Sequence, residues 1–195
     1  SPAGTTYVPG NAKAAPAFQP LRDIGHPGGR VWASRFVRHV LAEQRVSPAP
    51  GIKEYIDSAL ASLASNPRRE HRTISGLSFL LTPELKAALY PYTVRGNYGQ
   101  IFDADHDSVD SSSAVQMFEM GQLMGMGEEA VAPALDHIFH RTEARFDGRP
   151  PLLLLPAPWL CLPPPPFVDR LPSGPQPSPT TTAPPALPPH ATTPP

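Results

Sequence analysis

Apolar residues recur at helical spacing through the first three quarters of the chain. Three stretches with this spacing each predict an amphipathic helix, over residues 27–44, 51–65 and 128–145. Pro27 suits the first turn of the first helix, and Gly148 follows the end of the third. The expected buried positions on the three helices are Trp32, Phe36, Val40, Leu41, Ile52, Ile56, Leu60, Leu63, Val131, Leu135, Ile138 and Phe139.

Two shorter helices are predicted between the second and the third. Thr73 is expected to cap the first of them, and Thr82-Pro83-Glu84 supplies an N-cap, a first-turn proline and a first-turn acid for the other. The apolar residues expected inside are Ile74, Leu77, Leu80, Leu81, Leu85 and Leu89.

The stretches that predict β-strands are short, and they lie before and after the helix predicted over residues 128–145. Residues 98–102 and 114–118 are strand candidates around a polar loop, and the four leucines at 152–155 read as a strand covered on both faces. Residues 1–25 are expected to be a loop-like lead with an extended piece at 17–21. A helix followed by a buried strand is half of an α/β crossover unit, so we expect an α/β fold with a mostly helical subdomain.

Proline divides the chain near residue 150. Of 29 prolines, 18 fall within residues 150–195, where the only charged residues are Asp169 and Arg170. Because proline fixes φ and lacks an amide donor, this tail cannot build a helix or a central strand, and we expect it to be disordered. The expected domains are a lead at 1–25, a helical subdomain at 26–93, an α/β portion at 94–155 and the tail at 156–195.

The charge balance, the cysteine count and the search for targeting segments limit the classes of protein that this sequence fits. With 16 Lys and Arg against 17 Asp and Glu, no basic surface for nucleic acid is visible. The single cysteine, Cys161, excludes an internal disulfide framework. Neither a signal peptide nor a transmembrane helix is predicted, since the most apolar stretch, 150–168, is rich in proline.

Two patterns suggest metal ligands but depart from known sites. Asp103, Asp105 and Asp107 have the first three spacings of an EF-hand loop, yet Ser108 replaces the required Gly and Ala114 the required Glu. A solvated turn is the better interpretation.

The longest helix carries the second pattern. His137, His140 and Glu143 follow one another at intervals of three residues, which is not the spacing of a helical zinc site. Surface or interdomain ion pairs of Arg141 and Glu143 are the favoured interpretation, and no metal is predicted.

Nucleophilic catalysis and phosphate binding find little support. Ser111–Ser113 lie near His106 in sequence, but no nucleophile elbow is present and Cys161 lies in a proline-rich stretch. The only lysines are Lys13, Lys53 and Lys86, and none follows a glycine, so the chain has no P-loop.

The order of several motifs resembles a known family. Residues 18–155 resemble the TrbE-type conjugal-transfer ATPases of type IV secretion systems, in the VirB family. The matching stretches are Phe18-Gln19-Pro20-Leu21, the helix around Trp32, Ile52-Lys53-Glu54, Ala61-Ser62-Leu63, Arg72-Thr73-Ile74-Ser75-Gly76-Leu77, Gly99-Gln100-Ile101-Phe102-Asp103, Gln116-Met117-Phe118-Glu119-Met120, Leu135 to Glu143 and Asp147-Gly148-Arg149-Pro150.

This resemblance implies a fold, cofactors and partners. Residues 94–155 would be part of a RecA-like P-loop ATPase domain, which in the intact family binds ATP and Mg²⁺. Such proteins form hexamers at the cytoplasmic face of the inner membrane with other secretion subunits, and ATP hydrolysis powers pilus assembly and transfer of DNA or protein. The family-motif residues carried over are His140, Arg141, Glu143 and Trp159.

The chain departs from the family at the catalytic positions. The family's P-loop would lie upstream of Phe18, and its Walker B Asp and Glu match Pro156 and Ala157. No catalytic residue is intact, and we expect the chain alone to be inactive. One hypothesis is that residues after 155 are a frameshifted translation of the family's C-terminal half.

The alternative is a non-enzymatic adaptor with a small helical domain and a partner-binding tail. Its tail has Pro-x-x-Pro spacings at 163–166, 172–175 and 185–188, which could bind an aromatic groove as polyproline II.

Overall fold

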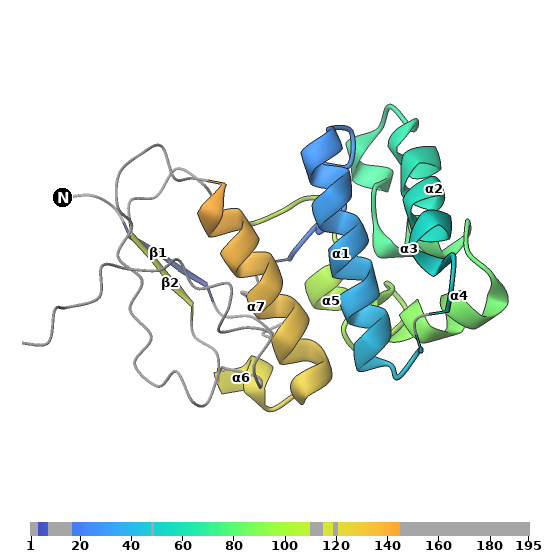
Figure 1. The fold of residues 1–195 in the computed structure, drawn as a ribbon. Helices are drawn as coiled ribbons and strands as arrows, with labels where there is room; N and C mark the ends of the chain where they lie inside the picture. The colour runs from blue at the N-terminus through green and yellow to red at the C-terminus, as the bar shows by residue number, and fades with distance from the viewer. Residues whose placement is uncertain (1–3, 8–16, 48, 110–114, 119–120, 145–195) are drawn as a thin grey trace, which may run out of the picture. The chain divides into compact units, whose positions relative to one another are not determined.

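The three long helices of the sequence analysis are present in the computed structural model, which describes residues 4–7, 17–47, 49–109, 115–118 and 121–144. They are α1 (Pro27–Glu43), α2 (Ile52–Ala64) and α7 (Glu128–Glu143), shown in Figure 1. Most predicted inward residues are buried, whereas Ile52, Val131 and Phe139 are only partly covered. Helical spacing was therefore a reliable guide here.

Short helical segments connect the long helices. These are the 3₁₀ turn η1 (Arg69–His71), α3 (Ile74–Ser78), α4 (Pro83–Leu89), the 3₁₀ turn η2 (Tyr90–Tyr92), α5 (Gly99–Phe102) and α6 (Gly121–Met124). The predicted cap on α3 is confirmed, because the Thr73 hydroxyl accepts the Gly76 amide at 3.0 Å. Thr82 occupies the N-cap of α4 but makes no side-chain cap. Leu80 was expected inside and is 41% exposed.

The prediction of a strand at 98–102 is wrong, because this segment forms α5. The amide of Tyr98 donates to the Pro91 carbonyl, and the amide of Phe102 donates back to Tyr98, which closes a helical turn. Gly99 permits the turn, since a Cβ there would collide with the Thr93 carbonyl. Ile101 and Phe102 are both buried, as adjacent residues of a helical turn enclosed by the core can be.

The lead is also more structured than the sequence indicates. Phe18 bonds α5 and the residues just after it, donating its amide to the Ile101 carbonyl and accepting the amide of Ala104. Residues 19–26 then form consecutive turns that bury Leu21 and Ile24 completely. A segment expected to be a loop therefore supplies part of the core.

A short parallel sheet accounts for the strands among the described residues. β1 (Gly4–Tyr7) pairs in parallel with β2 (Val115–Phe118), with Gly4 opposite Val115 and Tyr7 opposite Phe118. β2 lies within the predicted strand 114–118, whereas the predicted strand at 152–155 lies outside the described residues. The α/β expectation is corrected accordingly: the described part is mostly helical, with one two-stranded sheet.

The core lies around α1, which contacts α2 on one side and α7 on the other (Figure 1). Arg72, although a charged residue, is buried here, and its guanidinium donates to the carbonyls of Arg22, Ala64 and Asn66. The side-chain amide of Gln19 donates to the Arg69 carbonyl at 2.6 Å. These bonds fasten the lead to the end of α2. Contacts divide the chain into units Ser1–Pro163 and Pro164–Pro195, and every described residue belongs to the first.

Candidate functional site

A group of titratable side chains, most of them buried, lies along the second half of α7. His137 Nε2 is 3.0 Å from Asp107 Oδ2, and the two side chains are 1% and 0% exposed. Arg141, one turn further along α7, places its Nε 3.3 Å from the same oxygen. Its Nη1 is 3.2 Å from Asp23 Oδ2. We call Asp23, Asp107, His137 and Arg141 the α7 charge cluster.

Asp107 is the centre of this cluster and stays ionised. Burial alone would raise the pKa of its carboxyl group, but the hydrogen bond from His137 and the charges of His137 and Arg141 outweigh burial. The amide of Val109 adds a hydrogen bond at 3.1 Å to the other carboxylate oxygen. The pKa of Asp107 is therefore lowered from its usual value. A carboxylate held by this many donors serves as a structural anchor for α7 and is poorly suited to act as a base.

His140 lies beside the cluster against Trp32 of α1. The two rings stack in parallel, with centroids 4.0 Å apart and planes at 10°. Burial is the main cause, and together with the nearby charges of His137, Arg141 and Arg35 it lowers the pKa of His140 to about 4. The imidazole is thus neutral near pH 7 and acts as an aromatic partner for Trp32.

Protonation of His140 should weaken the folded state. The pKa of its imidazole is about 4 in the folded chain against an ordinary value of 6.5, so the unfolded chain binds the proton more tightly. The resulting loss of stability is absent above pH 6.5, grows as the pH falls to about 4, and then levels off. Because His140 is only partly buried, we expect a loss of about 1–2 kcal/mol, well below the full linkage value.

Urea unfolding of the full chain between pH 7 and pH 4.5 measures this dependence. The control is His140→Phe, which retains a ring against Trp32 but cannot titrate. Subtracting its profile removes the contributions of all other groups. Parallel pH profiles for the two proteins would show that His140 does not titrate as expected.

A second polar group ties α1 to α7. Asp136 is buried, with Oδ2 3.4 Å from His39 Nδ1 and Oδ1 4.0 Å from Arg35 Nη2. His39 Nε2 is also 3.4 Å from Glu43, one turn along α1. The contact between α1 and α7 is therefore electrostatic as well as apolar.

The three aspartates of the EF-hand-like spacing do not converge. The Asp103 carboxylate accepts the Ser75 amide at 2.9 Å, the Ser75 hydroxyl, and the Val94 amide at 2.6 Å. Asp105 is exposed and contacts only its neighbour His106, while Asp107 belongs to the α7 charge cluster. The interpretation as a solvated turn is wrong for Asp103 and Asp107, whose carboxylates join distant segments.

The helical histidine pattern is likewise divided among separate contacts. His137 binds Asp107, His140 stacks on Trp32, and Glu143 is exposed at the end of α7. Across the residues that the structure describes, no group of three potential ligands could hold a metal ion. Arg141 forms ion pairs, as the sequence suggested; the pair with Asp107 is largely buried, whereas Asp23 is partly exposed.

Several candidate residues lie outside the described ranges. They are Lys13, Ser111–Ser113, the strand at 152–155, Pro156, Ala157, Trp159, Cys161 and the Pro-x-x-Pro segments. In the part of the chain that is described, no helix is long and apolar enough to span a membrane.

Sequence reasoning missed the acidic half of the α7 charge cluster. The sequence alone predicts that residues 137, 140 and 141 place three polar side chains on one stretch of helix. Their partners, Asp23 and Asp107, lie 118 and 34 residues from Arg141 in the chain. No local pattern signals a pairing across such distances.

Comparison with known proteins places the chain among bacterial conjugal transfer proteins. It is 37% identical over 160 residues to the second portion of a probable conjugal transfer protein TrbE of Sinorhizobium fredii, and the match covers 82% of this chain and 24% of that protein. It is 36% identical over 163 residues to the conjugal transfer protein TrbE of Rhizobium radiobacter, covering 83% of this chain and 19% of that protein. No family model matches.

The chain therefore belongs to the TrbE-type conjugal transfer proteins. It spans about a quarter of the length of the first relative and a fifth of the second.

Proposed function

We propose that this chain corresponds to the middle of a TrbE-type secretion ATPase, between the P-loop and the end of the Walker B strand. The observation that carries the proposal is the similarity to two TrbE proteins over more than four fifths of the chain. In a complete protein, this segment would serve pilus assembly and the transfer of DNA or protein. The other secretion subunits, a hexameric assembly and a site at the inner membrane belong to the same proposal.

The fold assignment within the proposal is a helical subdomain at 26–93 followed by part of a RecA-like core at 94–155. The parallel pairing of β1 with β2 supports it, because parallel strands require a long crossover connection and are typical of α/β proteins. The chain between these strands contains α1 to α5.

The α7 charge cluster would fix the helix that leads into the proposed Walker B strand. Arg141 bonds Asp23 and approaches Asp107, so its guanidinium is committed to intramolecular contacts in this arrangement. We therefore assign Arg141 a structural role. His140 and Glu143 accompany it as family-motif residues without a catalytic contact.

ATP and Mg²⁺ would be bound by the complete family protein. This chain has no P-loop sequence, and it carries Pro156 and Ala157 where the family has the two acids. The acids matter because one holds Mg²⁺ and the other positions the attacking water. The purified chain is accordingly expected to show no ATP hydrolysis above a buffer blank.

A chimaera tests the proposal. Residues 18–157 of this chain replace the matching stretch of the Rhizobium radiobacter TrbE protein, and conjugation frequency is measured in a strain lacking its own TrbE. We expect background transfer with Pro156 and Ala157, and recovery when Pro156→Asp and Ala157→Glu are introduced.

The two chimaeras differ only at these positions, so each is the control of the other. Equal amounts of both proteins must be verified by immunoblot. Transfer without the two acids would disprove the Walker B assignment. Background transfer by both, at normal protein levels, would refute the proposed function.

A further inference from the structure

Large apolar side chains are exposed on α2 and on the short helices and turns that follow it. Of the seven such exposed side chains in the described residues, five come from α2, from the turn between α3 and α4, and from the segment starting at η2. We call Tyr55, Phe79, Leu80, Tyr90 and Val94 the apolar patch. Phe79 is 76% exposed and Val94 70%.

Contacts and helical spacing place the members of the patch near one another. The Lys86 ammonium lies 4.9 Å from the centre of the Phe79 ring, and Tyr90 follows Lys86 by four residues along a continuous helical path. The Tyr55 hydroxyl donates to the Leu80 carbonyl at 3.1 Å. At the other side, the Val94 amide bonds Ser75, which precedes Phe79 by four residues. The five residues therefore belong to one connected region.

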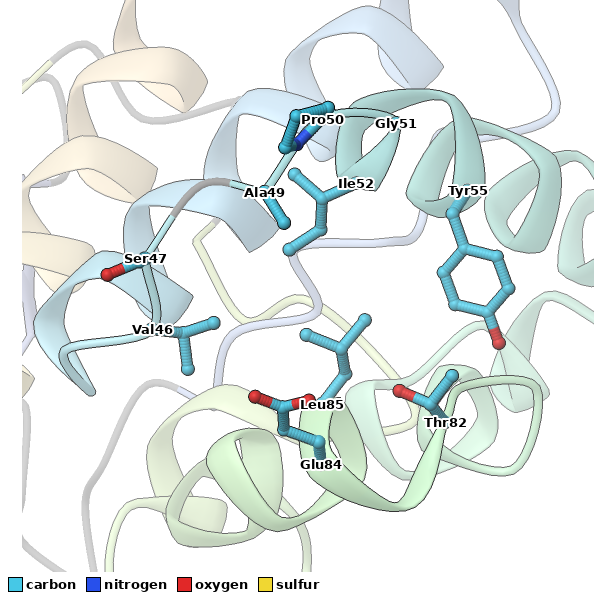
Figure 2. A pocket seen from close by; sticks show the side chains of 10 residues that line it. All are labelled: Val46, Ser47, Ala49, Pro50, Gly51, Ile52, Tyr55, Thr82, Glu84 and Leu85. Atoms are coloured by element: carbon cyan, nitrogen blue, oxygen red, sulfur yellow. The ribbon is translucent and has the colours of Figure 1, made fainter.

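A groove continues this surface beyond Tyr55. It has a cavity volume of about 270 Å³ and lies between the α1–α2 connection and the start of α4. In Figure 2, Leu85 of α4 points toward Ile52 of α2, and Tyr55 points from α2 toward Thr82. Val46 and Pro50 add apolar walls. A groove of this kind, next to exposed aromatic rings, can accept an apolar side chain of a partner.

Two cations beside the apolar patch favour a partner with carboxylates there, whereas the charged residue that lines the groove is Glu84. Lys86 covers Phe79, and the exposed Arg95 directly follows Val94. Neither cation has an ion-pair partner among the described residues. Desolvating them in an interface requires opposite charge from the partner.

The greater length of the TrbE relatives points to where such a partner resides. This chain spans 24% of one TrbE relative and 19% of the other, so most of a TrbE protein lies outside it. Apolar surface exposed by one part of a protein is commonly covered by another part of it. Resting on the proposed function, we propose that the apolar patch and its groove bind an apolar, carboxylate-bearing surface from the part of a TrbE protein that this chain does not span.

Cysteine labelling tests this interface. Phe79→Cys is introduced into the full chain with Cys161→Ser, and into the chimaera described above. The rate of maleimide modification at position 79 is followed by mass spectrometry of the labelled peptide. We expect rapid labelling in the isolated chain and a rate at least about tenfold lower in the chimaera, because an interface excludes solvent.

Val31→Cys is the matched control. Val31 is 73% exposed on α1, close to the value for Phe79, and lies outside the patch. It should label rapidly in both proteins. Val94→Cys provides a second site within the patch in case Phe79→Cys disturbs folding.

Three outcomes would overturn the proposal. Equal rates at position 79 in both proteins would mean that the rest of TrbE does not cover the patch. Protection of the isolated chain that increases with its own concentration would identify a second copy as the partner. Protection that requires anionic lipid vesicles would identify a membrane surface. Labelling does not depend on conjugation, so failure of this interface and failure of the proposed function are distinguishable.

Discussion

Asp107→Ala is expected to lower the free energy of unfolding by about 3–5 kcal/mol, because it removes the carboxylate that the buried His137 ring and the Arg141 guanidinium both contact. His137 and Arg141 both approach the same Asp107 oxygen, at 3.0 and 3.3 Å. His137 is almost fully buried and cannot recover its lost hydrogen bond from water. Urea unfolding of the full chain at pH 7, followed by circular dichroism at 222 nm, measures the effect.

Asp105→Ala is the control for this substitution. It lies two residues away in the same loop, and its side chain is exposed and contacts only His106. Its effect should stay within about 0.5 kcal/mol. Comparable losses for the two variants would mean that Asp107 does not anchor α7.

Phe18→Ala is expected to have a similarly large effect, about 3–5 kcal/mol, through loss of packing. The Phe18 ring is fully buried and lies 6.0 Å from the Phe102 ring and 4.7 Å from His137, measured between centroids. Removing it opens a cavity between the lead, α5 and α7. The same urea experiment, supported by thermal unfolding, measures the loss.

Phe79→Ala removes an identical side chain from an exposed position. The side chain is 76% exposed and the substitution removes its contact with Lys86, so the expected cost is below about 1 kcal/mol. If Phe18→Ala were no more harmful than Phe79→Ala, the lead could not be part of the core.

Helices were predicted correctly where the apolar spacing and the capping residue that define them lie within one segment of the sequence. The apolar spacing of α1 and α2 and the cap at Thr73 are local properties, and all three were confirmed. Residues 98–102 failed because consecutive apolar residues fit either a short strand or a helical turn. The backbone bond from Tyr98 to Pro91, and the close approach of the Thr93 carbonyl that only a glycine allows at position 99, decided between them.

The candidate site was predictable only in part, for a related reason. Helical spacing brought His137 and Arg141 onto the same stretch of α7, but the residues that give them their role come from elsewhere in the chain. Asp103 and Asp107 resembled a ligand series, and the fold turns them toward Ser75 and His137 instead. The spacing of residues in the sequence does not predict which distant residue each side chain will contact in the fold.

The pairing of β1 with β2 has a consequence for synthesis of the protein. Gly4 pairs with Val115, 111 positions later, so β1 leaves the ribosome long before its partner strand exists. At about 5–20 residues per second, β1 waits on the order of 6–22 seconds. The helices between them form within microseconds and can pack in that interval. Strand pairing is thus expected to be a late event in biogenesis, and an unpaired β1 edge gives a chaperone time to bind.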